Sequence, residues 1–345
     1  MRLLLRAAGG ATVAALVSAP AEAAHPMSYL SGFGAKAYPV VALTWGLIII
    51  SAVVLLICTV LVAVGAWRRR VSPSGETPAA GVALVPVRRG PSGLGWLSLA
   101  VGVSFVVLLG SLVWTVVVLA AVTGPPRPAK LTIEVTGQQW WWKARYLNKE
   151  NPSAILTTAN EIHIPTGEPV RIKLIGGDVI HSFWVPPLTG KTDTIPGQVN
   201  ETWLEAEKPG RYRGQCTEFC GWQHAHMALF VVAEPRAEFD KWYLDQLQPA
   251  AAPKGEAVRG ENRFVFRCGA CHTVRGTEAG GTVAPDLTHL MSRATIAAGT
   301  LPNTVAYLSG WIANPQTIKP GNHMPDLYLS GPELQDIRSF LLTLK

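Results

Sequence analysis

Charged residues are unusually scarce in this sequence. Only 15% of its 345 residues are charged, against about 25% in a typical soluble protein, and 48% are hydrophobic. Such a chain is not a disordered protein, and part of it is expected to lie in lipid. The formal net charge of +7 divides into +7 for residues 1–129, −2 for residues 130–253 and +2 for residues 254–345. The folded part therefore lacks the basic excess of a nucleic-acid-binding domain, which excludes that class of partner.

Cysteine is scarce as well. Five cysteines in 345 residues are too few for a disulfide scaffold. Four of them form two close pairs, Cys216 with Cys220 and Cys268 with Cys271, whereas Cys58 stands alone in an apolar run. The paired spacing indicates two sites with sulfur chemistry rather than a scatter of core thiols.

Two long runs lack charge altogether, residues 40–67 and 96–122, and each exceeds the roughly 20 residues that cross a bilayer as a helix. One acidic residue lies between them, together with five arginines: Arg68, Arg69, Arg70, Arg88 and Arg89. The positive-inside rule places this loop in the cytoplasm and the rest of the chain on the other side. Residues 24–129 are therefore a predicted transmembrane hairpin. Residues 1–23 are typical of a signal peptide, with an uncleaved N-terminus as the alternative.

The sequence pattern changes after Pro125-Pro126. Residues 131–135, 161–164, 170–174 and 228–232 alternate between apolar and polar side chains, with turn signals between them. This pattern predicts a small antiparallel sandwich or barrel, followed by a helix over residues 235–247. Residues 248–255 are typical of a linker, and the signals in residues 256–345 are helical.

Soft metal ligands are concentrated in residues 216–227. This segment contains two thiols, two imidazoles and one thioether. That combination suits copper better than magnesium or calcium. Zinc and a Cys216–Cys220 disulfide remain alternatives on residue chemistry alone.

The second cysteine pair belongs to Cys268-Gly269-Ala270-Cys271-His272, the C-x-x-C-H attachment motif of c-type haem. Cys268 and Cys271 would bind the haem covalently, and His272 would ligate its iron. Met324 is the expected second axial ligand because a thioether opposite an imidazole suits an electron relay. His323 and Met291 are its rivals, and a redox C-x-x-C beside a chance histidine is the alternative to haem. We expect His289 to lie at the surface.

The copper segment has the form C-x-E-x-C-x3-H-x2-M, which resembles the binuclear copper signature of cytochrome c oxidase subunit II. Residues 137–142, 178–186 and 191–197 resemble further segments of that family, and residues 256–345 resemble a small cytochrome c domain. The resemblance implies a multi-domain membrane protein with a two-helix transmembrane hairpin. An all-β cupredoxin-like domain over residues 130–247 and a small all-α cytochrome c domain would follow.

The same resemblance implies a role for each matching residue. Cys216 and Cys220 would bridge two copper ions of a CuA centre. The remaining copper ligands would be His181 and Met227 on one ion, and His224 with the backbone carbonyl of Glu218 on the other. The side chain of Glu218 would bind magnesium or manganese at the border with subunit I. Trp140 matches the exposed tryptophan where electrons enter in that family.

The function implied is that of the electron-entry subunit of a terminal cytochrome c oxidase of the proton-translocating class. Electrons would pass from a soluble or membrane-bound c-type cytochrome through haem c and CuA to subunit I, where dioxygen is reduced to water. Subunit III is a further expected partner. The expected location is a bacterial inner membrane, with both redox domains in the periplasm.

Two departures from the family pattern concern residue types. Gln138 stands where many relatives have histidine, and the second apolar run lacks the glutamate that many relatives place at the mouth of a proton pathway. The proton route is therefore expected to differ, or subunit I supplies the acid. Nitrous oxide reductase is a second hypothesis, but no segment of this chain is long enough to form the propeller domain of that enzyme. A membrane-anchored copper carrier is a third hypothesis. Six ligands, however, make a closed site, whereas a carrier needs a site that can exchange its metal.

Overall fold

The computed structural model describes residues 27–69, 92–147 and 155–345. The chain divides into two compact units, residues 38–124 and residues 1–37 with 125–345, which are described separately here. The predicted signal peptide and the loop arginines Arg70, Arg88 and Arg89 lie outside the described residues.

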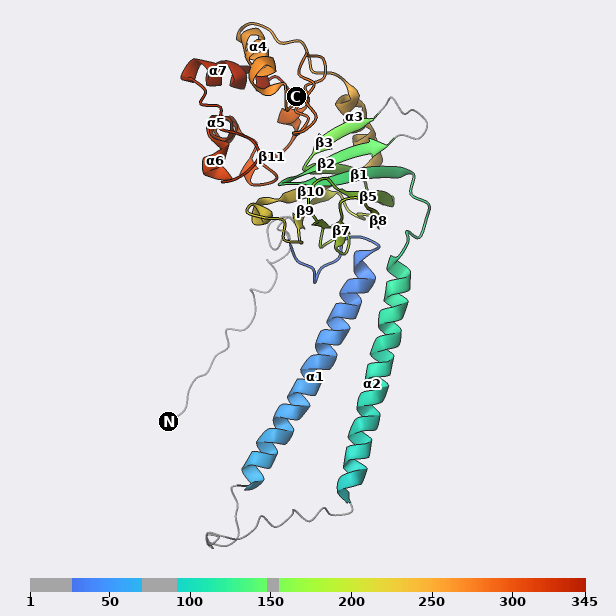
Figure 1. The fold of residues 1–345 in the computed structure, drawn as a ribbon. Coiled ribbons are helices and arrows are strands. Elements are labelled where there is room, and N and C mark those ends of the chain that lie inside the picture. The colour runs from blue at the N-terminus through green and yellow to red at the C-terminus, as the bar shows by residue number, and fades with distance from the viewer. Residues whose placement is uncertain (1–26, 70–91, 148–154) are drawn as a thin grey trace, which may run out of the picture. The chain divides into compact units, whose positions relative to one another are not determined.

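Within the described residues 38–69 and 92–124, the first unit contains the helices α1 (Ala37–Arg69) and α2 (Ser92–Val122), drawn in blue and turquoise in Figure 1. Both are long and apolar enough to cross a membrane, and nearly all of their large apolar side chains are exposed. The indole of Trp114 in α2 packs over Gly46 in α1, where an added Cβ would lie 2.3 Å from the ring. The missing side chain at Gly46 therefore lets the two helices approach at this point.

The second unit begins with a β-rich part. In the described residues of 130–234, two five-stranded sheets enclose one hydrophobic core. The first sheet has the order β3-β2-β1-β5-β8, with β1 Leu131–Gln138, β2 Trp141–Leu147, β3 Leu156–Ala159, β5 Val170–Gly176 and β8 Val199–Leu204. The second has the order β4-β10-β9-β6-β7, with β4 Glu161–Pro165, β6 His181–Trp184, β7 Thr192–Thr194, β9 Gly210–Cys216 and β10 Ala228–Glu234.

Alternating side chains explain why these segments fold as strands. In β5, Val170, Ile172 and Leu174 are fully buried, whereas Arg171 and Lys173 face outward. Successive residues of a strand point to opposite faces, so such a segment can cover the core with one face only. The β1–β5 and β4–β10 pairs are parallel and the other named pairs of these sheets are antiparallel. The prediction of an antiparallel sandwich or barrel was therefore wrong for these two strand pairs.

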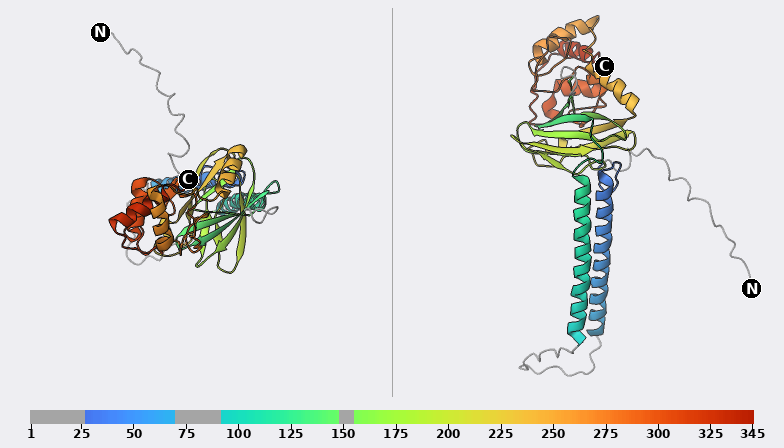
Figure 2. Two further views of the ribbon diagram at one scale, coloured as in Figure 1. Left: turned by 90° about the horizontal axis from the view of Figure 1, so that it is seen from above. Right: turned by 90° about the vertical axis from the view of Figure 1, so that its right-hand side faces the viewer.

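The C-terminal part is helical. It contains α3 (Arg236–Leu247), α4 (Glu256–Cys268), α5 (Val305–Ala313), α6 (Pro315–Ile318) and α7 (Gly331–Leu341), with short strands β11 (Thr295–Ile296) and β12 (Leu301–Pro302) and the 3₁₀ turn η2 (Leu290–Ser292). A capping box between Ser330 and Glu333 begins α7. Phe264 of α4 packs on Phe340 of α7 with ring centroids 5.4 Å apart. Figure 2 shows these orange and red helices beside the green and yellow strands in both views.

This architecture confirms the predicted fold class: two apolar helices, a β-rich domain and a helical C-terminal domain. We call residues 130–247 the copper domain and residues 256–345 the haem domain, following the predicted boundaries. Both belong to the same compact unit.

Candidate copper and haem sites

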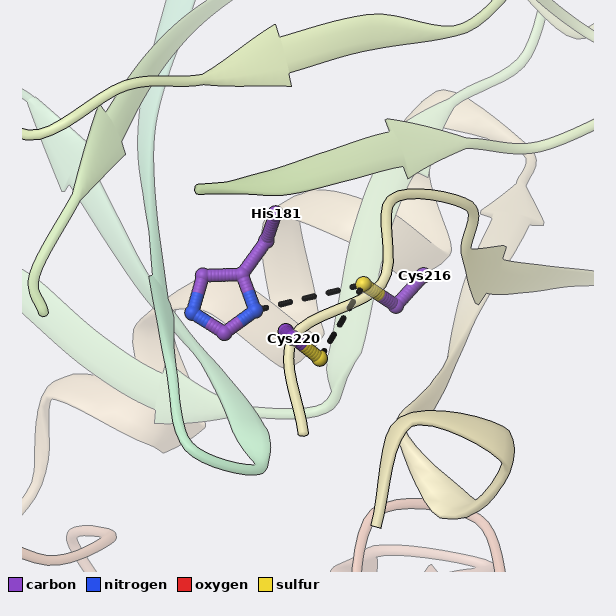
Figure 3. A group of neighbouring side chains, drawn as sticks. All are labelled: His181, Cys216 and Cys220. Atoms are coloured by element: carbon purple, nitrogen blue, oxygen red, sulfur yellow. Dashed lines mark hydrogen bonds between the residues drawn. The ribbon is translucent and has the colours of Figure 1, made fainter. Parts of the chain in front are cut away.

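Two strands and a loop bring the first three copper-ligand candidates together. His181 begins β6, Cys216 ends β9, and β6 pairs with β9 so that Phe183 lies opposite Cys216. The Cys216 Sγ lies 3.9 Å from His181 Nδ1 and 3.8 Å from the Sγ of Cys220, which follows on the loop after β9 (Figure 3). All three side chains are buried. The structure therefore brings together residues that stand 35 positions apart in the chain.

The other three candidates surround the same sulfur atoms. Cys220 Sγ lies 3.5 Å from His224 Nδ1 and 4.0 Å from Met227 Sδ, and Cys216 Sγ lies 3.4 Å from the carbonyl oxygen of Glu218. His224 belongs to the 3₁₀ turn η1 (His224–His226), which leads directly into Met227. Thiolates and imidazoles bind metals at roughly 2.0–2.3 Å, so metal ions fit between donors with these spacings. The residues present thus suit a soft-metal centre with bridging thiolates.

The orientation of His181 is determined by Asp178. The Nε2 of His181 lies 2.7 Å from Asp178 Oδ1, which leaves Nδ1 facing Cys216. Asp178 also accepts hydrogen bonds of 2.6 Å from the backbone N–H groups of Gln139 and Val179. Burial opposes ionisation of Asp178, but these hydrogen bonds hold its carboxyl pKa below the ordinary value. A carboxylate behind a ligating imidazole is the usual way to fix its ring orientation.

Gly137 of β1 supplies the space for that imidazole. A Cβ on Gly137 would lie 2.9 Å from His181 Cδ2 and 3.0 Å from the hydroxyl oxygen of Thr194. Carbon atoms normally touch at about 3.5–4.0 Å, so a larger residue would collide with the ring. The glycine that opens the aromatic segment 137–142 is therefore part of the site.

The two neighbouring thiols differ in how readily they lose a proton. The hydrogen bond with Cys220 is the largest cause that lowers the Cys216 pKa, and further hydrogen bonds from His181 and the backbone outweigh burial, which brings it to about 4. The same proximity raises the pKa of Cys220. A thiolate is the form of cysteine that binds metals. Cys216 is thus prepared as a thiolate, whereas a positive metal ion would be needed to release the proton of Cys220.

The haem motif lies at the end of α4 and in the turn that follows. His272 Nδ1 lies 2.8 Å from the carbonyl oxygen of Pro285. This contact assigns the N–H to Nδ1 and leaves Nε2 available as an iron ligand. Burial also lowers the pKa of His272, which favours the neutral form that ligates metals. Burial raises the pKa of the Cys268 thiol to about 11.

A cavity of about 370 Å³ opens beside this motif. Its size is within the roughly 300–1,000 Å³ that is typical of ligand and cofactor sites. Cys268, Cys271, His272 and Met324 all line it, and so does an apolar set: Phe264, Leu287, Leu290, Leu308, Ile312 and Leu341. An apolar cavity with two thiols and an imidazole at its wall fits a covalently attached haem.

The cavity separates Met291 from the other two candidates for the second axial ligand. Met324 and His323 line it, whereas Met291 packs with the core of the haem domain instead. The loop that carries Met324 is held by Gln316, whose side-chain amide donates to the carbonyl oxygens of Asn322 and Met324. The structure brings Met324 to the haem motif, from which it is separated by more than 50 residues.

Trp140 lies in the turn between β1 and β2 and is only 8% exposed. Its indole Nε1 donates a 3.0 Å hydrogen bond to the carbonyl oxygen of Cys220, and its ring lines the cavity of the haem motif. The imidazole of His323 approaches the indole, with ring centroids 5.5 Å apart. The resemblance implied an exposed tryptophan, but in this chain the haem domain covers it.

Sequence reasoning missed two residues of this region and misjudged a third. Asp178 stands in the predicted segment 178–186, but no role was assigned to it. Lys319 is 3% exposed and reaches into the copper domain, which no local pattern indicates. His289 is 7% exposed and its ring contacts the carbonyl oxygens of Lys345 and Gln248, so the prediction of a surface residue was wrong.

Two family models match the chain. The model of the cytochrome c oxidase subunit II periplasmic domain matches residues 149–234, and that of cytochrome c matches residues 257–345. Together they cover about half of the chain. The two matches correspond to the copper domain and the haem domain.

Relatives with known names agree with these matches. The chain is 39% identical over 217 residues to cytochrome c oxidase subunit 2 of Alkalihalophilus pseudofirmus, covering 62% of this chain and 61% of the relative. It is 33% identical over 229 residues to cytochrome c oxidase subunit 2 of Bacillus sp. PS3, covering 62% of each. The alignments thus span about three fifths of each relative.

Solved structures also resemble this chain. The periplasmic domain of cytochrome oxidase subunit II from Bradyrhizobium japonicum is 33% identical, with a TM-score of 0.33, over 35% of this chain and 95% of that domain. The two matched regions contain the candidate copper and haem sites, and two helices long and apolar enough to cross a membrane precede them. The chain is similar to the cytochrome c oxidase subunit II family over residues 149–234 and to cytochrome c over residues 257–345.

Proposed function

We propose that this chain is the electron-entry subunit of a terminal cytochrome c oxidase. It accepts electrons from a c-type cytochrome and delivers them to subunit I, where dioxygen is reduced to water. The observation that carries the proposal concerns Trp140, which lines the cavity of the C-x-x-C-H motif and donates a hydrogen bond to the carbonyl oxygen of Cys220. One side chain thus links the candidate haem site to a candidate copper ligand.

The copper domain would hold a CuA centre of two copper ions that supplies reversible one-electron transfer. Cys216 and Cys220 would hold the ions through their thiolates. The other ligands are His181, His224, Met227 and the carbonyl oxygen of Glu218. Strands β6 and β9 and the loop after β9 fix these donors, so their geometry changes little between redox states. The side chain of Glu218 binds magnesium or manganese at the border with subunit I.

The haem domain would hold one covalent haem c, a second one-electron centre. Cys268 and Cys271 would attach it covalently, and His272 and Met324 would hold its iron. The carbonyl oxygen of Pro285 orients His272, and the apolar wall of the cavity excludes water. A thioether opposite an imidazole raises the reduction potential of the iron.

The covered position of Trp140 supports a particular order of electron transfer. An external cytochrome cannot contact an indole that is 8% exposed. Electrons therefore enter at the haem domain, pass Trp140 and reach the copper ligands through Cys220. The physiological donor, soluble or membrane-bound, docks on the haem domain.

The two apolar helices anchor the chain in a bacterial inner membrane. Residues 1–23 are the signal peptide, the loop between α1 and α2 is cytoplasmic, and both redox domains are periplasmic. Subunit I is the direct partner and subunit III completes the complex. Proton translocation belongs to that complex, and its proton route does not use an acidic residue in the apolar run 96–122, since the sequence has none there.

The test uses the full chain in detergent, matured with haem and loaded with copper. We would measure the copper-to-iron ratio and the electron paramagnetic resonance spectrum. Two coppers for each iron, with one unpaired electron shared by both coppers, are expected. A single localised copper, or copper that a mild chelator removes, contradicts the oxidase proposal and favours the copper carrier. Cys216→Ser is the matched variant, because it removes one bridging sulfur and should abolish the shared-electron spectrum while haem attachment persists.

A further inference from the structure

Lys319 is a buried cation that crosses from the haem domain into the copper domain. It follows α6 and precedes the loop that carries Met324, and it is 3% exposed. Its Nζ donates hydrogen bonds to the carbonyl oxygens of Trp140 at 3.1 Å, His226 at 2.9 Å and Ala297 at 3.4 Å. Two of these acceptors belong to the copper domain, and the third belongs to the haem domain.

The groups around Lys319 form a binding site that suits an ammonium group. Among the described residues, no carboxylate forms an ion pair with it; its polar partners are carbonyl oxygens. Burying a charge is costly unless polar groups compensate it, and three carbonyls match the three donors of an ammonium group. Burial lowers the pKa of Lys319 to about 8, and Cys220 opposes that shift. At neutral pH the ammonium form therefore still predominates.

The two copper-domain acceptors of Lys319, Trp140 and His226, belong to segments that contact or contain candidate copper ligands. Trp140 is the residue whose indole donates to Cys220, and His226 ends the turn between the ligand candidates His224 and Met227. A single side chain of the haem domain thus bonds to the backbone on both sides of the candidate copper site.

The residues after Lys319 contact the copper domain as well. The carbonyl oxygen of Pro320 accepts a 2.7 Å hydrogen bond from the side-chain amide of Gln223. His323 then approaches Trp140, and Met324 lines the haem cavity. Lys319 therefore begins a six-residue stretch that ends at the candidate axial ligand.

A strained loop of the haem domain supports the same contact. Ala297 and Ala298 have φ angles of 52° and 55°, in the left-handed region that alanine rarely adopts. Ala297 provides one carbonyl to Lys319, and the carbonyl oxygen of Ala298 accepts a 3.0 Å hydrogen bond from the backbone N–H of Ala228 in β10. Such strain persists where surrounding contacts hold the backbone in place. Here the strained backbone turns the carbonyl oxygens of Ala297 and Ala298 toward the contact between the two domains.

We propose that Lys319 is the positioning residue that holds the haem domain on the copper domain in one register, with the haem cavity against Trp140. The proposal rests on the proposed function for its consequence, since fixed docking matters only if both domains carry redox centres. The hydrogen bonds that hold the haem domain on the copper domain involve neither the haem iron nor copper. The haem domain is thus a fixed relay rather than a carrier that swings on its linker.

The test compares the full chain in detergent with Lys319→Met, which keeps an unbranched side chain one atom shorter than lysine but removes its charge and donors. Hydrogen exchange is followed at the amide of Ala228, which bonds to Ala298 across the contact. Its protection should fall at least tenfold, because one or more buried carbonyls lose their donor; each tenfold loss equals about 1.4 kcal/mol. Amides in the core of each domain should keep their protection.

Two further variants control this result. Lys254→Met removes an exposed lysine of the linker before the haem domain and should leave the Ala228 amide unchanged. Lys319→Gln keeps two N–H donors and should give an intermediate loss of protection. If Lys319→Met unfolds the domain, the graded comparison with Lys319→Gln still tests the proposal. Unchanged protection of Ala228 in both Lys319 variants overturns it.

A second readout separates positioning from general stability. In the loaded wild-type chain, the rate of electron transfer from haem to copper should be independent of solvent viscosity. In Lys319→Met it should fall and become viscosity-dependent, since the haem domain must then re-dock. A reduced rate without viscosity dependence overturns the positioning role. A wild-type chain without haem or copper refutes the proposed function, whereas the exchange result at Ala228 remains valid.

Discussion

Replacing Gly137 by alanine tests whether the copper site depends on a missing side chain. The new Cβ would lie 2.9 Å from His181 Cδ2, whereas carbon atoms normally touch at about 3.5 Å or more. The imidazole must therefore retreat by roughly 0.6 Å. Bonds between metals and their ligands tolerate about 0.2 Å, so the retreat is about three times larger than the site allows.

The same substitution should also lower stability without any metal. His181 is fully buried and its ring packs edge-on against Trp142, with centroids 6.1 Å apart, so the ring has little free space. Overpacking of this kind costs about 1–3 kcal/mol. For a unit of this size, each kcal/mol lowers Tm by about 2–4 °C, which predicts a fall of about 2–12 °C for the metal-free chain.

The assay records the thermal unfolding of the metal-free chain and the paramagnetic resonance spectrum after copper loading. Gly137→Ala should unfold earlier and lose the spectrum of an electron shared by two coppers. Gly190→Ala is the matched control, because nothing lies within 4 Å of an added Cβ there. If Gly137→Ala keeps both the wild-type Tm and the wild-type spectrum, the packing argument is refuted.

Three further predictions concern single side chains. Asp178→Asn should weaken copper binding about 10–100-fold in a metal-competition titration, because the carboxylate that orients the ligating imidazole is lost; equal affinity would contradict this role. Met324→Ala should keep covalent haem but lower its reduction potential in a redox titration, and an unchanged potential would favour another axial ligand. Burial alone would lower the pKa of His163, but hydrogen bonds to Glu161 and Glu234 raise it above 6.5. Its contribution to stability is therefore complete below about pH 6.5 and is lost as the pH rises through the folded-state value. Urea unfolding should show this loss in the wild type and not in His163→Gln; identical pH profiles would refute it.

Local patterns in the sequence were sufficient for the elements of this fold. Apolar runs without charge predicted α1 and α2, since length and composition alone decide whether a helix can span lipid. Alternation predicted strands such as β5, because the period of a strand is a property of the backbone. Parallel pairing of β1 with β5 escaped prediction, because pairing depends on how the chain returns and not on the strand itself.

The residues of the candidate site also divide into those that a local sequence pattern reveals and those that it does not. Cys216, Cys220, His224 and Met227 stand within twelve residues, so their spacing could be recognised directly. His181 was reached only through a family resemblance, since nothing local connects it to Cys216. A glycine such as Gly137 and a carboxylate such as Asp178 show their roles only when the packed neighbours are known.

What the sequence by itself determined is the chemistry: which thiols, imidazoles and thioethers are present, at which spacing, and beside which apolar runs. What only the tertiary structure decided is where those groups face one another. Lys319 bonds to the backbone of Trp140 across 179 positions of sequence, and the haem domain to which Lys319 belongs covers the indole which the resemblance implied to be exposed. The physical reason is that residue spacing reports short-range geometry, whereas burial and docking arise from the packing of segments distant in the chain.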